Sequence, residues 1–107
     1  MTLKEAQKKV DDWIKKYGVR YFNELTNLAV LMEETGELAR VIARKFGEQS
    51  AKNEDMDYKI QEELADILFV LICIANQTNT DLTKAFEDTL LKKTNRDLTR
   101  HINNPKL

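Results

Sequence analysis

The sequence contains few of the residues that interrupt a helix. Of its 107 residues only three are glycine and one is proline, and that proline, Pro105, lies close to the end. Glycine and proline are the least favourable residues in a helix interior. Because both are scarce while 42% of the residues are hydrophobic and 33% are charged, the composition predicts an all-α, helix-rich globular protein. A chain of this length forms one domain, which we place at residues 1–100, with residues 101–107 as a C-terminal tail.

Cysteine and histidine occur once each, which excludes an internal disulfide and a zinc site with the usual Cys/His spacing. A lone cysteine fits a reducing cytosol, so we expect a cytoplasmic protein. No apolar segment of a signal peptide follows Met1, and the apolar run 67–75 is too short to cross a bilayer. The net charge of −1 gives no support for the basic surface of a protein that binds a nucleic-acid polymer.

Polar residues that cap helix N-termini occur at three positions, Thr2, Asn23 and Asp81, and Thr2 has the capping-box partner Glu5 three residues later. Gly18 and Gly47 are expected helix stops. We therefore expect helices over about residues 3–17, 24–46, 57–76 and 82–100. The polar segment 47–55 is long for a connection in a helical bundle and resembles segments that close over active sites.

Two acidic pairs lie on the two most apolar predicted helices: Glu34 with Glu37, and Glu63 with Asp66. Residues three apart lie on the same face of a helix, so each pair forms a patch of two carboxylates. If the two helices pack antiparallel, the patches can meet at one point. Four carboxylates at one point repel each other unless a cation neutralises them. Hard oxygen ligands favour Mg²⁺, with Mn²⁺ as an alternative, and Mg²⁺ commonly binds phosphates as well.

A structural interpretation of these acids remains open. An acidic pair on a helix is most often a solvated face, and Asp66 could form a buried salt bridge with Arg44 or Lys93. Glu34 is in line with apolar residues, so a charge there requires a partner. Glu34 lies at the edge of the apolar face of its helix, which is formed by Leu25, Leu28, Met32, Ala39 and Ile42.

Other candidate residues also have two interpretations. The basic residues of the last helix, which include Lys92, Lys93 and Arg96, either complement the helix C-terminus or clamp phosphates. Trp13 is either a core residue or a stacking partner for a base. Asn76 is either a cap of the third helix or a contact to a ligand.

The stretches LMEETGELA (31–39) and EELADILFV (62–70) resemble the EExxE…ExxD signature of the MazG-like, all-α nucleoside triphosphate pyrophosphohydrolases. The resemblance covers about residues 10–96. It implies a four-helix bundle completed by homodimerisation, in some members a dimer of dimers. It also implies Mg²⁺-dependent cleavage of nucleotides between the α and β phosphates, which yields a nucleoside monophosphate and pyrophosphate in nucleotide-pool house-cleaning.

The resemblance also implies roles for individual residues. By motif position the metal ligands are Glu34, Glu37, Glu63 and Asp66. Glu33 and Glu34 are the candidate catalytic acids, with Glu33 as a water-activating base or an acid just outside the ligand set. Substrate contacts are expected from Lys93, Asn95 and Arg96 near the end of the last helix, in addition to Trp13 and Asn76.

Two rival functions follow from the same sequence. One is a non-catalytic helical regulatory or binding module, in which the acids form structural ion pairs. The other is an enzyme of the same helical group that hydrolyses phosphoribosyl-ATP.

Overall fold

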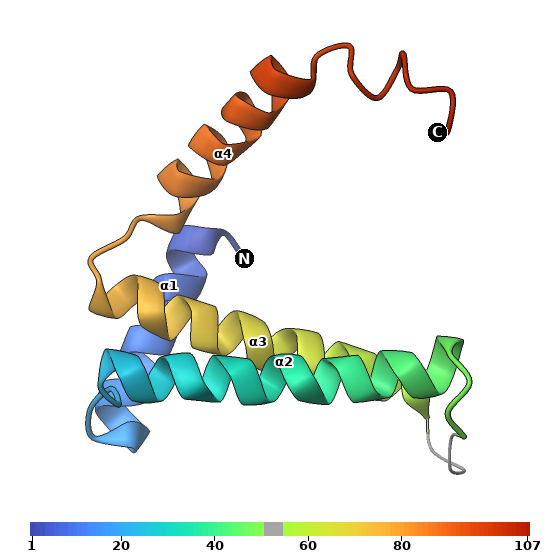
Figure 1. Ribbon diagram of the computed structural model, residues 1–107. Helices are drawn as coiled ribbons and strands as arrows, with labels where there is room; N and C mark the ends of the chain where they lie inside the picture. Colours follow the sequence, from blue (N-terminus) through green and yellow to red (C-terminus); the bar gives the residue numbers. More distant parts are fainter. Residues whose placement is uncertain (51–54) are drawn as a thin grey trace.

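The computed structural model describes residues 1–50 and 55–107, and every regular element in these two ranges is helical. The elements, in chain order, are α1 (Leu3–Trp13), the π-helical segment η1 (Ile14–Gly18), α2 (Glu24–Phe46), α3 (Met56–Gln77) and α4 (Leu82–Asp97) (Figure 1). The predicted all-α class is confirmed. Part of the predicted loop 47–55, namely 51–54, lies outside the described residues.

The predicted helix starts are confirmed by their capping hydrogen bonds. The Thr2 hydroxyl accepts from the Glu5 amide at 3.0 Å, and the Thr2 amide donates to the Glu5 carboxylate at 3.3 Å. Asn23 accepts from the Thr26 amide at 2.8 Å, and Asp81 accepts from two amides of the first turn of α4. These contacts satisfy amide groups that have no partner within the helix.

The end of α1 differs in detail from the prediction. The α-helical winding ends at Trp13 and continues as η1 to the expected stop at Gly18. The next residue, Val19, has a φ of 69°, a left-handed conformation that is unfavourable for a β-branched side chain. The chain therefore turns sharply between η1 and α2.

Helices α2 and α3 form an antiparallel pair that holds most of the core (Figure 1). Asn27 donates to the Gln77 side chain at 2.7 Å at one end of the pair, and Lys45 forms an ion pair with Asp57 at the other. Four of the few buried apolar residues belong to α3: Val70, Ile72, Cys73 and Ala75. Helix α3 also packs against α1, so it is the central helix of the fold.

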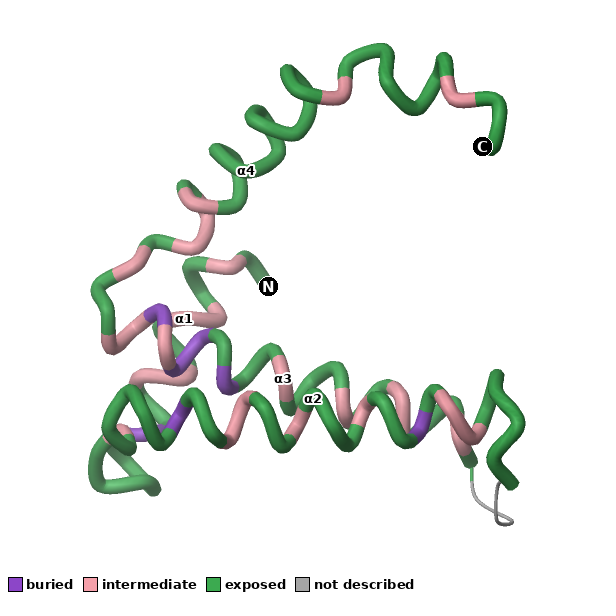
Figure 2. Tube along the Cα trace, in the orientation of Figure 1, coloured by how far each residue is buried: buried purple, intermediate pink, exposed green. Residues whose placement is uncertain are grey.

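Helix α4 projects away from the other helices, and none of its residues is buried (Figures 1 and 2). The side chain of Leu91 is 61% exposed, and the apolar face of α2 is also open, with Met32 65% exposed. The radius of gyration is 17.5 Å, whereas a compact chain of this length is expected near 13 Å. The four helices therefore do not close a bundle within one chain. None of the described helices is long and apolar enough to cross a membrane.

Candidate metal centre

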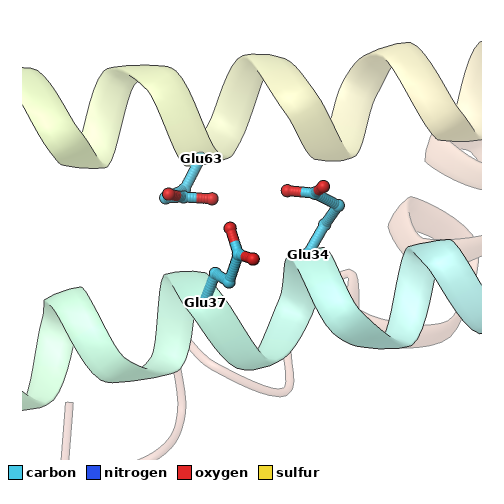
Figure 3. A group of neighbouring side chains, drawn as sticks. All are labelled: Glu34, Glu37 and Glu63. Atoms are coloured by element: carbon cyan, nitrogen blue, oxygen red, sulfur yellow. The ribbon is translucent and has the colours of Figure 1, made fainter.

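Three carboxylates meet between α2 and α3. Each of Glu34, Glu37 and Glu63 offers one oxygen, and these oxygens all lie within 4.8 Å of one another (Figure 3). Glu34 and Glu37 are one turn apart on α2, and α3 brings Glu63 to them from the opposite side because the two helices run antiparallel. The predicted meeting of the two acidic patches therefore occurs for three of the four acids.

Two of these carboxylates contain an oxygen that is buried and has no hydrogen-bond partner, Oε2 of Glu34 and Oε2 of Glu63. Burial raises the pKa of Glu34, and the charges of Glu37 and Asp66 raise it further. Burial also raises the pKa of Glu63, with Glu37 as the next cause. The cluster is therefore electrostatically unfavourable by itself, as expected for like charges held together at a partly desolvated point.

The alternative in which these acids form structural ion pairs is not seen in the part of the chain that the structure describes. There, no arginine forms an ion pair with Glu34, Glu37, Glu63 or Asp66, although Arg40 and Arg44 line a hollow together with Glu37 and Glu63. The arginine partner that would make the acids a purely structural feature is therefore not seen in that part of the chain.

Asp66 lies outside the group of three, and it is exposed rather than buried as its apolar surroundings in sequence had led us to expect. Its charge nevertheless contributes to the raised pKa values of Glu34 and Glu63, so it is close to the cluster. Glu33 is also exposed. The roles of Asp66 as a ligand and Glu33 as a base stay predictions.

The donor set fits a hard divalent cation. All of the converging atoms are carboxylate oxygens, which Mg²⁺ and Mn²⁺ favour. A cation held by these oxygens would give the two unpartnered oxygens a partner and would offset the repulsion among the three charges. The residues present therefore fit the metal that the sequence predicted.

A cavity of about 430 Å³ adjoins the acids, because Glu34 and Asp66 form part of its wall. Aromatic residues also line this cavity, and the Trp13 and Phe69 rings meet edge to face with their centroids 5.7 Å apart. Trp13 is 49% exposed, so it is not a core residue, and a flat ring system can reach it. The volume lies within the range typical of small-ligand sites.

The other predicted substrate residues lie away from the acids or are already hydrogen-bonded. Asn76 donates from Nδ2 to the Gln7 carbonyl and the Tyr21 hydroxyl, and its Oδ1 accepts from Gln7. The predicted phosphate contacts, Lys93, Asn95 and Arg96, lie on α4, which extends away from the α2–α3 pair (Figure 1). Within one chain, α4 therefore does not contribute to the metal centre.

Three residues near the cavity were not singled out from the sequence. Arg20 and Tyr21 form part of its wall, and Asn27 is a buried polar residue at 5% exposure. Asn27 could have been found, because it continues the face of Val30 and Glu34 and would need a partner there. Nothing in the sequence marks Arg20 or Tyr21, since their placement depends on the turn at Val19.

Comparison with known proteins gives consistent matches. Residues 22–101 match the family described as MazG nucleotide pyrophosphohydrolase domain. The uncharacterised protein YpjD of Bacillus subtilis is 38% identical over 99 residues, which cover 92% of this chain and 89% of YpjD. A crystal structure of the Bacillus-conserved MazG protein, a nucleotide pyrophosphohydrolase, has a TM-score of 0.74 at 41% identity and covers 86% of this chain and 88% of that chain. The crystal structure of YpjD has a TM-score of 0.79 at 37% identity, with 91% and 97% covered.

Proposed function

This chain belongs to the MazG nucleotide pyrophosphohydrolase family, and from that premise we propose that it hydrolyses nucleoside or deoxynucleoside triphosphates between the α and β phosphates in a Mg²⁺-dependent reaction. The products are a nucleoside monophosphate and pyrophosphate, and the physiological role is removal of unwanted nucleotides. The observation that carries the proposal is the pair of buried, unpartnered oxygens of Glu34 and Glu63 beside a cavity of ligand size.

In this proposal Glu34, Glu37 and Glu63 hold the cation, and Asp66 completes the ligand set from the next turn of α3. The cation would neutralise phosphate charge and lower the pKa of a bound water. Glu33 or Glu34 would take a proton from the attacking water, whose oxygen forms a bond to the α phosphorus while the bond from that phosphorus to the bridging oxygen breaks and pyrophosphate leaves. The helices keep the carboxylates fixed, which suits a reaction that depends on positioning.

The cavity would hold the nucleoside part of the substrate. Trp13 presents an accessible indole, and Phe69 holds the plane of that indole by packing against it edge to face. A base stacked on Trp13 would place its phosphates toward Glu34 and Asp66, which line the same cavity. The side chain of Asn76 is already hydrogen-bonded, so it would influence the nucleotide through Tyr21 and the cavity wall rather than by contact.

We also propose that the chain acts as a homodimer, with a dimer of dimers as a larger alternative. The apolar face of α2 and the side chains of Phe86 and Leu91 on α4 are exposed, and such surface is normally covered. Because α4 projects from its own chain, its Lys93, Asn95 and Arg96 would contact phosphates at the metal centre of the second copy (Figure 1).

Mixed dimers test this arrangement. One variant carries Asp66→Asn, and the other carries Lys93→Ala with Arg96→Ala; each alone should be inactive. In a heterodimer purified through two different tags, one site receives intact acids from one chain and intact basic residues from the other, so activity should return. If the basic residues act within their own chain, the heterodimer stays inactive.

The direct test of the function is release of pyrophosphate from a panel of nucleotides that includes phosphoribosyl-ATP, with products identified chromatographically. We expect a monophosphate and pyrophosphate from at least one triphosphate, dependent on Mg²⁺. Asp66→Asn and Glu37→Gln should each abolish release. Activity that persists in both variants would remove the metal assignment, and absence of any turnover by the wild type would favour the non-catalytic module.

A further inference from the structure

Among the described residues, Arg20 is the one cationic side chain that lines the cavity shared by Trp13, Glu34 and Asp66. Its Nη1 donates to the adjacent Tyr21 carbonyl at 2.8 Å. Arg20 forms no ion pair with another described residue, although the acids Glu34 and Asp66 belong to the same cavity wall. The guanidinium group thus retains donors at Nε and Nη2 for a further partner.

The backbone around Arg20 adopts an unusual conformation. Val19 before it has a φ of 69°, and the Arg20 amide donates to the Gly18 carbonyl at 2.8 Å. A β-branched residue in this region is unfavourable, and such a conformation persists only where the surrounding structure enforces it. Gly18, Arg20 and Phe22 all line the cavity, so this turn between η1 and α2 places Arg20 in the cavity wall.

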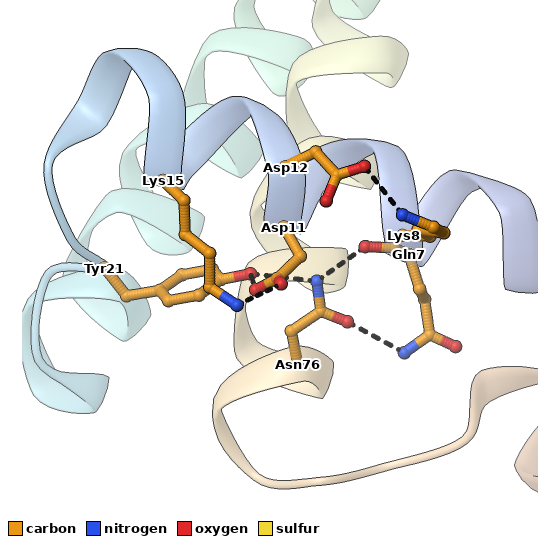
Figure 4. A network of polar contacts seen from close by, with 7 residues as sticks. All are labelled: Gln7, Lys8, Asp11, Asp12, Lys15, Tyr21 and Asn76. Atoms are coloured by element: carbon orange, nitrogen blue, oxygen red, sulfur yellow. Dashed lines mark hydrogen bonds and ion pairs between the residues drawn. The ribbon is translucent and has the colours of Figure 1, made fainter.

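The two residues after Arg20 are anchored to other helices, and Figure 4 shows the contacts of the first of them, Tyr21. The Tyr21 hydroxyl donates to Asp11 of α1 at 2.7 Å and accepts from Asn76 of α3 at 3.0 Å. The Phe22 carbonyl accepts from the side chain of Gln77. These anchors join the segment to α1 and α3, and they hold the Arg20 backbone in place beside the cavity.

We propose that Arg20 binds a phosphate group of the nucleotide, as a binding residue separate from the acids and from the basic residues of α4. This inference rests on the proposed nucleotide function. The acids of this cavity repel a phosphate, whereas a guanidinium group attracts it and can donate two parallel hydrogen bonds to its oxygens. A base on Trp13 and a phosphate between Arg20 and the metal centre would together span the cavity.

The single tryptophan, Trp13, lines the same cavity and provides a binding signal that does not require turnover. Its fluorescence is titrated with a nucleoside, the corresponding monophosphate and an α,β-methylene triphosphate analogue, in Mg²⁺ and again in EDTA. All three probes carry the same base, chosen as the one whose triphosphate analogue quenches the fluorescence of the wild type most strongly. The variants are Arg20→Ala and Arg20→Lys, with Arg100→Ala, at an exposed arginine beyond the end of α4, as the arginine control.

We expect Arg20→Ala to weaken binding of the monophosphate and of the triphosphate analogue about tenfold or more, while binding of the nucleoside is unchanged. Arg20→Lys should recover part of the loss, because it keeps the charge without the paired donors. Arg100→Ala should bind all three probes like the wild type. Equal weakening of the nucleoside would mean that Arg20 contacts the base, and unchanged binding of all three would mean that it contacts nothing; either result overturns the proposal.

The outcome is distinguishable from failure of the proposed function. Wild-type quenching by nucleotides without pyrophosphate release would refute the hydrolase and leave the Arg20 assignment standing. Pyrophosphate release with unchanged binding in Arg20→Ala would refute only the Arg20 assignment. Because Arg20 is exposed, circular dichroism of Arg20→Ala should match the wild type, which would confirm that any loss of binding is local.

Discussion

Replacing Glu34 by glutamine should stabilise the metal-free protein and, at the same time, remove its stabilisation by Mg²⁺. The two effects have opposite signs because the same charge repels its neighbours in the absence of a cation and, in the proposed function, would bind the cation when it is present. Glutamine keeps the shape of the side chain, and its amide group can donate to the unpartnered oxygen of Glu63.

The size of the first effect follows from the distances. The carboxylate oxygens lie within 4.8 Å of one another. At that limit two charges repel by about 0.9 kcal/mol in a dielectric of about 80 and by about 3.5 kcal/mol at about 20. Glu37 is exposed, so the lower end applies, and relief of its repulsion and that of Glu63 should amount to about 1–2 kcal/mol. For a domain of this size that corresponds to a rise in melting temperature of roughly 5 °C.

The second effect follows from mass action. A ligand at about one hundred times its dissociation constant stabilises the folded state by about 2.7 kcal/mol, or roughly 10 °C in melting temperature. Glu34→Gln should lose most of this shift. Thermal melts with EDTA and with excess Mg²⁺, at one fixed protein concentration, measure both effects in the same samples.

Glu62→Gln is the matched control, because Glu62 is an exposed acid next to Glu63 and does not belong to the cluster. It should change neither the metal-free melting temperature nor the Mg²⁺ shift. The reasoning is refuted if Glu34→Gln melts lower than the wild type in EDTA, or if it retains the full response to Mg²⁺.

Three further predictions concern the supporting contacts. Tyr21→Phe removes a hydroxyl with two side-chain partners, and it should lower the free energy of unfolding in urea by about 2 kcal/mol. Burial raises the pKa of Tyr21 to about 12, so this difference from the wild type should be present below pH 10 and vanish as the pH rises toward 12. A difference that stays constant over this pH range would refute the prediction. Asn27→Ala leaves Gln77 without its buried partner and should lower the free energy of unfolding in urea by about 1–3 kcal/mol. Asn95→Ala, on exposed α4, should leave the free energy of unfolding nearly unchanged in the same measurement. Arg96 holds the pKa of Asp97 well below its usual 3.8. Asp97→Asn should therefore lower the melting temperature at neutral pH, and this difference from the wild type should disappear as the pH falls below 3.8. A difference that grows in acid would contradict the pairing of Arg96 with Asp97.

The helix starts and the convergence of the acids could be predicted because they depend on local spacing. Thr2 and Glu5 satisfy amides within the same turn, and Glu34 and Glu37 share a face on any α-helix. The antiparallel pairing that brings Glu63 to them was a condition of this prediction, and the structure meets that condition.

The remaining features depend on contacts between distant residues. Tyr21 and Asn76 are 55 positions apart, and their hydrogen bond exists only because the turn at Val19 takes the chain back across α3. The exposure of Asp66 could not be read from its apolar neighbours in sequence, since α3 is left partly open within one chain. The direction of α4 likewise has no local signal, because so little of α4 packs on its own chain.

The hydrogen bond between Asn27 and Gln77 and the ion pair between Lys45 and Asp57, at the two ends of the α2–α3 pair, affect how the two helices are aligned. An interface of interchangeable aliphatic side chains could slip along the helix axis by one turn, about 5.4 Å, at little cost. Such a slip would separate Asn27 from Gln77 and Lys45 from Asp57, leaving a buried amide unsatisfied. Both contacts lie away from the acids, yet they favour the alignment of α2 with α3 in which Glu63 lies opposite Glu34 and Glu37. Substitutions at these ends should therefore impair cation binding without altering any of the residues that would touch the ion.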